Sequence, residues 1–142
     1  MKNYKSLIIG IAAAVFFLFM ILFIIKGAEN RAIGLEENVQ TAQSDISVQI
    51  DRRFNVLTEL AECVRNYDEH EYQTLKDVIE ARGKNMSGSQ ADEVMAQINA
   101  VAEAYPDLKS NENYKQLMNE VSTTENLLAQ FKQAFNEFRK KL

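Results

Sequence analysis

The chain has 142 residues, an apolar content of 46% and a formal net charge of −4. After Lys26 it carries thirteen basic and twenty acidic side chains, a net charge of −7, which argues against binding to nucleic acid and against adsorption to anionic lipid. The single cysteine, Cys63, excludes an internal disulfide, and the length suits one domain plus a short anchor.

The N-terminal part is expected to be a membrane anchor behind a short tail, residues 1–6. Residues 7–25 contain no charged side chain. In a helix they would span about 28 Å, close to the thickness of about 30 Å of a bilayer's hydrocarbon core. A cleaved signal peptide is the alternative, but its apolar region has only about 7–15 residues and its cleavage site needs small residues. Lys26 stands at that point here, so we predict an uncleaved, single-pass helix.

The charges that flank the anchor predict its orientation. Lys2, Lys5 and the α-amino group precede the apolar run, whereas Lys26 and Arg31 follow it. Positive residues favour the cytoplasmic side of the cell (inner) membrane, so the N-terminus is expected inside and the larger domain on the extracytoplasmic side.

The anchor also contains a small-xxx-small pair, Gly10 and Ala14. Such a pair lets two membrane helices approach closely, so self-association into a homo-oligomer is a further hypothesis.

Two long helices are predicted, one at the start of the domain and one at its end. Beyond a joint at residues 26–34, apolar residues recur at spacings of three and four, the period of a helix, and no run alternates as a strand would. The first stripe comprises Leu35, Val39, Ala42, Ile46, Ile50, Phe54, Leu57, Ala61 and Val64. The last stripe comprises Tyr114, Leu117, Val121, Thr124, Leu128, Phe131, Phe135, Phe138 and Leu142, a repeat that predicts coiled-coil-like packing.

Two shorter helices are predicted between them. Asp68 resembles the N-cap of the first, residues 83–88 form a turn, and Ser89 resembles the N-cap of the second. Pro106 ends that helix, and the last helix is expected to start near Ser110 or Asn111. The predicted fold is all-α: one transmembrane helix, then an antiparallel up-and-down four-helix bundle over residues 35–142 with long first and last helices.

The sequence offers no catalytic or metal-ligating constellation, and no cofactor is expected. His70 is the only histidine, and the chain has no glycine-rich phosphate loop, serine elbow or zinc spacing. A Cys63–His70 dyad is disfavoured, because the predicted helix break near Asp68 separates the two residues. We therefore expect a protein that is not an enzyme.

Two polar features are candidate sites. Arg52 and Arg53 lie in the middle of the first long helix and would either grip an anionic partner or pair with carboxylates of a facing helix. Pairing is the favoured reading, in a structural polar layer with Glu125 and Asn126 that would set the register of the helices. The second feature is a candidate partner-binding tip, made of Tyr105, Pro106, Asp107, Lys109, Asn111 and Asn113. Part of this segment is already explained as a helix stop and restart.

Three blocks of the sequence resemble the LemA family. They are residues 44–57 (SDISVQIDRRFNVL), residues 67–82, and YPDLKSNENY at 105–114 followed by Thr124-Glu125-Asn126. The chain departs from the family pattern at Gln43, where a tryptophan is usual, and at Thr58-Glu59, where Pro-Asn is usual. The resemblance implies a bacterial, membrane-located four-helix bundle behind one membrane helix, and it implies no active site.

We weigh several functions from this reading. The first is a membrane-anchored scaffold or adaptor, facing the cell envelope, that holds a protein partner. The alternative is a signalling or sensor-like bundle that acts across the membrane. A lysis-type coiled coil and an enzyme acting on envelope polymers come after these.

Overall fold

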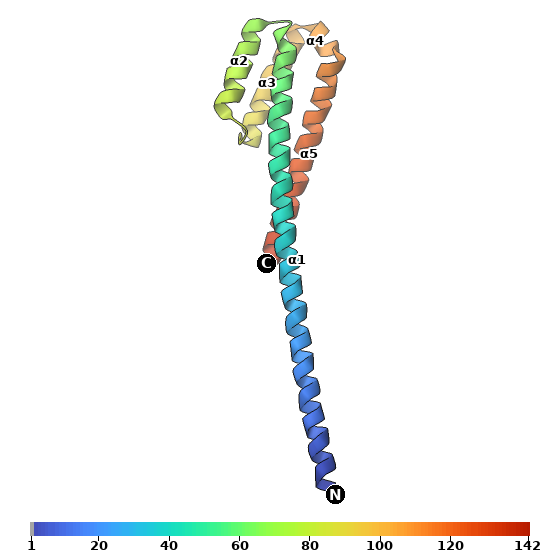
Figure 1. Cartoon of the computed structure of the whole chain (residues 1–142). Coiled ribbons are helices and arrows are strands. Elements are labelled where there is room, and N and C mark those ends of the chain that lie inside the picture. The colour runs from blue at the N-terminus through green and yellow to red at the C-terminus, as the bar shows by residue number, and fades with distance from the viewer. Residues whose placement is uncertain (1) are drawn as a thin grey trace.

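The computed structural model describes residues 2–142, and these are helical except for short turns (Figure 1). No strand occurs among these residues, so the predicted all-α class is confirmed. The five helices are α1 (Lys2–Arg65), α2 (Glu69–Arg82), α3 (Gly88–Ala104), α4 (Pro106–Ser110) and α5 (Glu112–Lys141).

Helix α1 is one continuous helix of 64 residues, so the predicted joint at residues 26–34 does not interrupt it. This segment lacks proline, and an isolated glycine in a helix costs only about 1 kcal/mol relative to alanine. Helix growth from strongly helical flanks therefore continues through Gly27 and Gly34. The expected tail is also helical from Lys2 onward, and Met1 lies outside the described residues.

The apolar stretch that begins at Leu7 forms the first third of α1. It is long and apolar enough, by length and composition, to cross a membrane. Its large side chains from Leu7 to Ile25 are exposed, and they contribute nothing to the packed core. Their exposure is what a helix surrounded by lipid requires.

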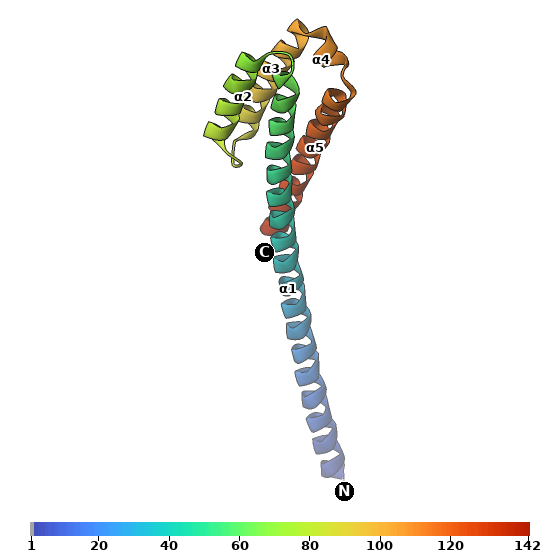
Figure 2. The same ribbon diagram turned by 45° about the horizontal axis from the view of Figure 1, so that its top comes forward.

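The other helices gather around the distal part of α1 (Figures 1 and 2). Helices α2 and α3 flank only its upper part, whereas α5 descends beside it almost to the apolar stretch. The first and last helices are the long ones, with 64 and 30 residues against 14 and 17 for α2 and α3. We call residues 36–131 the head, and residues 26–35 with 132–142 the foot.

The buried face of α1 is wider than the predicted stripe and is rotated from it. Leu57, Ala61 and Val64 are buried as predicted, but Val56 and Leu60 are buried as well. Farther down, Gln49 and Arg53 are buried, while the predicted Ile50 and Phe54 are half-buried. The reason is that α1 contacts α5 on one side and α2 and α3 on another, so its buried arc must serve two neighbours.

The helix ends agree with the sequence at Asp68 and Asn111 and differ at one position. Asp68 and Asn111 are N-caps, but the cap of α3 is Ser87 instead of the predicted Ser89. Ser87 Oγ accepts from the N–H of Gln90 (3.2 Å), and Gln90 Oε1 accepts from the N–H of Ser87 (2.8 Å). This reciprocal capping box satisfies two amide groups at once, which a start at Ser89 would leave without these partners.

Pro106 ends α3 at Ala104 and also begins a short helix that the sequence analysis did not predict. Proline is tolerated at the first helical position because that amide has no intrahelical partner. Helix α4 buries Leu108 completely and so closes the end of the core. It connects α3 to α5 across the top of the head.

Candidate functional site: a buried arginine and the tip of the head

Arg53 joins three parts of the head. Its side chain is only 2% exposed, and Nη1 donates to Glu125 Oε1 on α5 at 3.3 Å. Nη2 donates to the carbonyl oxygen of Met86 in the loop between α2 and α3. The neighbouring Arg52 forms an exposed ion pair with Glu120 (2.8 Å). The structure thus places both arginines against carboxylates of α5.

Two uncharged polar residues are buried with Arg53 in the interior of the head. Gln49 lies one turn below Arg53 on α1, and Thr124 precedes Glu125 on α5; both are buried. Among the described residues, Gln49 Oε1, Arg53 Nε and Thr124 Oγ1 have no hydrogen-bond partner. Asn126, the fourth residue of the predicted layer, is exposed. The sequence analysis missed Gln49 because its apolar neighbour Ile50 fitted the stripe.

The α2–α3 loop is fastened to α1 at this level. Met86 is 2% exposed and belongs to the core, and Lys84 pairs with Asp51 at 3.2 Å. Gly83 has a φ of +65°, in the region that favours glycine, and it turns the chain out of α2. The buried arginine therefore links α1, α5 and this loop.

At the opposite end of the head, Tyr105 belongs to an intramolecular contact. Its hydroxyl donates to Asp68 Oδ2 at 2.8 Å, and its ring lies 6.3 Å from that of Tyr67, centroid to centroid. The N–H of Glu71, and then the Tyr105 hydroxyl, lower the pKa of Asp68; the bond to Asp68 in turn raises the pKa of Tyr105. Tyr105 thus ties the end of α3 to the turn between α1 and α2.

We expect this contact to make the stability of the head depend on acid pH. The pKa of Asp68 is lowered on folding, so its contribution is present above about 3.9, the pKa of a free Asp, and is lost as the pH falls through the folded value. Asp68→Ala should lower the melting temperature at neutral pH by roughly 3 to 5 °C. Thermal unfolding followed by circular dichroism at several pH values measures both effects.

Asp68→Asn is the matched control, because asparagine caps a helix as well as aspartate does. Its melting temperature at neutral pH should fall less than that of Asp68→Ala, because the cap is kept while an amide nitrogen replaces the oxygen that accepts from Tyr105. The acid-dependent component should be absent. An unchanged acid dependence in this variant would assign that dependence to other carboxylates.

The remaining residues of the predicted tip are all exposed, and two of them also make structural contacts. Pro106, Asp107 and Lys109 are exposed, with Lys109 Nζ at 3.8 Å from the carboxylate of Glu103. Asn111 caps α5 by accepting from the N–H of Tyr114, and Asn113 Nδ2 donates to Cys63 Sγ at 3.4 Å. These five residues therefore remain accessible to a partner.

An acidic cleft of about 290 Å³ lies beside the tip, where the end of α1 meets the start of α5. Asn111 and Asn113 line it together with four residues that the sequence analysis did not single out as binding residues: Glu59, Glu62, Asn66 and Tyr67. Helical spacing alone could have placed Glu59, Glu62 and Asn66 on one face of α1, but only the packing of α5 brings the two asparagines opposite them.

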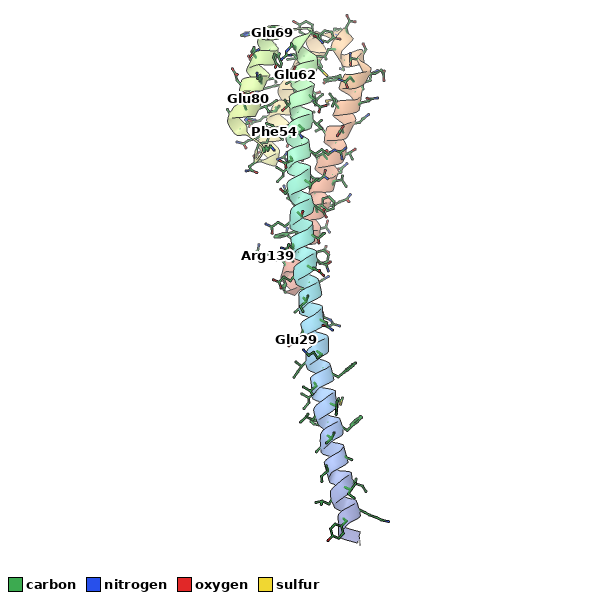
Figure 3. The ribbon with its side chains drawn as sticks, in the orientation of Figure 1. Glu29, Phe54, Glu62, Glu69, Glu80 and Arg139 are labelled. Atoms are coloured by element: carbon green, nitrogen blue, oxygen red, sulfur yellow. The ribbon has the colours of Figure 1, made fainter. Side chains whose placement is uncertain are left out.

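Glu62, labelled in Figure 3, is held by neighbouring side chains. Its carboxylate accepts from the hydroxyl of the buried Tyr72 at 2.7 Å and pairs with Arg65 at 3.0 Å. The guanidinium of Arg65 also lies over the Tyr72 ring, 4.2 Å from its centroid. These contacts hold the Glu62 carboxylate in one position on this side of the cleft.

Cys63 lines the same cleft and is half-buried. Burial raises the pKa of its thiol, the hydrogen bond from Asn113 opposes that rise, and the negative charges of Glu59 and Glu62 add to it. The thiol is therefore protonated at neutral pH, whereas a nucleophilic cysteine needs a lowered pKa. Among residues 2–142, no group of three or more His, Cys, Asp or Glu side chains is placed to hold a metal ion.

Alkylation of Cys63 by iodoacetamide should be slower at neutral pH than alkylation of a free thiol. The increase of its rate with pH should be centred at a higher pH than that of a free thiol, because the pKa of Cys63 is raised. Glu59→Gln should move the rate profile to lower pH because it removes a repelling charge. Asn113→Ala should move it to higher pH because it removes the donor to sulfur. The pH dependence of the labelling rate, measured by mass spectrometry, tests all three, and a profile centred below the ordinary thiol pKa would contradict them.

Comparison with known proteins supplies a family. The model of the LemA family matches residues 42–142, well over half of the chain. The chain is also 28% identical over 138 residues to a protein named Protein LemA from Metamycoplasma hominis. That match covers 85% of this chain and 63% of the relative, so the chain spans less than two thirds of the relative's length.

Proposed function

The chain belongs to the LemA family, and we propose that it is a non-enzymatic, membrane-anchored scaffold or adaptor whose acidic head holds a protein partner. The observation that carries this proposal is the continuity of α1, which runs without a break from the apolar stretch into the core of the head. A continuous helix fixes the head relative to the bilayer, which a flexible linker would not do.

The dimensions of α1 support a display role. At about 1.5 Å per residue, the forty residues that follow Ile25, up to Arg65, place the tip roughly 60 Å from the edge of the hydrocarbon core. Helix α5 lies along α1 over most of this distance. The tip would therefore meet partners well above the headgroups.

Within this proposal the head is an antiparallel four-helix bundle formed by α1, α2, α3 and α5. Contacts of α1 with each of the other three helices, and of α2 with α3, support it. A coiled-coil seam between α1 and α5 is supported by buried or half-buried residues seven apart on both helices: Ala42, Gln49 and Val56, and Leu117, Thr124, Phe131 and Phe138.

The partner that fits the head is a protein with a basic surface. The head contains eight basic and eighteen acidic side chains, a net charge of −10. Charge complementarity speeds encounter and selects partners. The exposed Asp107 and the neighbouring acidic cleft make the tip the place where such a partner would bind.

We further propose that the N-terminus lies in the cytoplasm and the head outside it. Lys2, Lys5 and the amino group on one side of the apolar stretch, against Lys26 and Arg31 on the other, support this orientation. Protease treatment of intact cells stripped of their outer barriers tests it. Digestion of the head before membrane rupture is expected, and protection until rupture would reverse the orientation.

Site-specific photo-crosslinking in intact membranes tests the scaffold. A photoreactive residue at Asp107, on the tip, should capture a distinct protein that the same residue at Gln73, exposed on α2, does not capture. Charge reversal in the neighbouring cleft by Glu59→Lys should reduce the yield of that product. Identical products from both positions would count against a partner-binding tip.

A signalling or sensor-like role is the second candidate, and the continuity of α1 also favours it. Because α1 belongs to both the core and the apolar stretch, a change in head packing would move the membrane segment directly. A ligand would support this role over a passive scaffold if it raises the melting temperature of the head and also changes the distance between labels on the apolar stretches of neighbouring chains.

A further inference from the structure

The charge of the chain is strongly polarised along its length. The head has a net charge of −10, but the foot contains six basic and two acidic side chains, a net charge of +4. The basic residues of the foot are Lys26, Arg31, Lys132, Arg139, Lys140 and Lys141. The net charge of the whole chain hides this separation.

Folding brings the two halves of the foot together beside the apolar stretch. Ile24, Gly27, Arg31 and Leu35 of α1 line one pocket of about 510 Å³ with Lys141 of α5 and with Leu142. The last turn of α5 therefore lies level with the end of the membrane-spanning segment. Figure 3 shows Arg139 on the lower part of α5, above Glu29 of α1.

This level lies just beyond the headgroup layer of a bilayer. Arg31 lies six residues beyond Ile25, a rise of about 9 Å, and the headgroup region of one leaflet is roughly 5 to 7 Å thick. Long basic side chains can extend along the helix toward phosphate groups. The foot thus presents cations within side-chain reach of lipid phosphates.

Contacts within the chain do not explain all of these cations. Lys26 pairs with Glu29 at 3.0 Å on the surface, and Lys141 lies 6.0 Å from the Phe138 ring centroid. Basic residues in the last turn of α5 also suit the helix dipole, but that effect does not account for Arg31 on α1.

We propose that the foot binds anionic phospholipid headgroups of the leaflet on the same side as the head, through Lys26, Arg31, Arg139, Lys140 and Lys141. This inference rests on the proposed membrane anchor. The binding clamps the end of α5 to the bilayer surface, while the acidic head is repelled from the same surface, so the molecule stands upright.

The test uses the full chain in vesicles, with Phe138→Trp as a fluorescent reporter, since the chain contains no tryptophan. Vesicles contain phosphatidylcholine alone or mixed with phosphatidylglycerol, and both carry the same nitroxide-labelled headgroup lipid as quencher. Quenching should be stronger with phosphatidylglycerol and should fall to the phosphatidylcholine level at high salt.

Removing the α5 cations should abolish the effect of lipid charge. R139Q/K140Q/K141Q in the reporter background should show equal quenching in both lipids, because each charge contributes about fivefold to surface association. K76Q/K109Q/K115Q removes the same charge from the head and should leave the lipid difference intact.

Each outcome decides between the proposals. Equal quenching of the reporter in both lipids would overturn lipid binding by the foot. So would an equal loss of the quenching difference between lipids in the two triple variants. Flotation of the vesicles in a density gradient tests the anchor separately. If quenching shows no lipid binding but the protein floats with both kinds of vesicle, the proposed anchor stands. Failure to float with either vesicle would overturn the anchor, and lipid binding by the foot would fall with it.

Discussion

Replacing Arg53 with alanine should lower the free energy of unfolding of the head by about 2 to 4 kcal/mol. The change removes a side chain that is 2% exposed and leaves the Met86 carbonyl without its donor. Glu125 loses its cationic partner, but its side chain is 35% exposed, so water can compensate in part. Urea unfolding followed by circular dichroism measures the loss.

Two further substitutions separate the contributions of Arg53. Glu125→Gln keeps an acceptor at a partly exposed position and should cost about 1 kcal/mol or less. Arg53→Met keeps the packing of the core, so it should cost much less than Arg53→Ala, although Glu125 and the Met86 carbonyl both lose their donor. Arg53→Met should still free the α2–α3 loop, because Met86 loses its hydrogen bond.

Hydrogen exchange distinguishes the loop from the core. Amide exchange over residues 83–87 should accelerate in both Arg53→Ala and Arg53→Met, whereas exchange in the core of α1 should accelerate only in the alanine variant. If exchange in the loop were unchanged in both variants, Met86 burial alone would hold the loop, and Arg53 would have no role in fastening it.

Gly34→Pro should break the continuity on which the scaffold proposal rests. Proline in a helix interior removes one backbone hydrogen bond and clashes with the preceding turn, at a cost of about 3 kcal/mol. The strain lies in the foot, so α1 should kink there while the head stays folded. Spin labels at Asn30→Cys and Ser47→Cys, in a Cys63→Ser background, should change from one narrow distance near 25 Å to a shifted, broad distribution.

Gly34→Ala is the matched control. A Cβ at Gly34 would meet no other atom within 4 Å, so alanine should leave the distance unchanged and stabilise the helix by up to about 1 kcal/mol. The Gly34→Pro variant should also lose the specific crosslink at Asp107 if display height matters. A crosslink that survives the kink would show that the partner reaches the head without the rigid helix.

Local patterns in the sequence predicted most helices and their ends. The three-to-four spacing of apolar residues identified the four main helices. Residue chemistry placed a cap at Asp68 and the stop at Pro106, and it narrowed the cap of the last helix to Ser110 or Asn111. These features depend on residues close together in the chain, so a local reading is sufficient. The same reading failed at residues 26–34, where the helix continues. The cost of two glycines in a helix is smaller than the stabilisation that cooperative growth from both flanks provides.

Several features of the candidate sites depended on tertiary structure. Which face of α1 is buried depends on the direction from which α5 and the α2–α3 loop approach, and that approach buries Gln49 and Arg53 in place of Ile50 and Phe54. The same packing ties Tyr105 to Asp68, a contact that the sequence analysis did not predict.

The sequence by itself determined the helical class, the apolar stretch and the family resemblance, because periodicity, run length and motif order are properties of the chain alone. Only the tertiary structure decided which distant residues meet: Arg53 with Glu125, Asn113 with Cys63, and Lys141 with the end of the apolar stretch. Such meetings follow from the register and rotation of packed helices. These are set by the fit of all their side chains together, and no local segment encodes them.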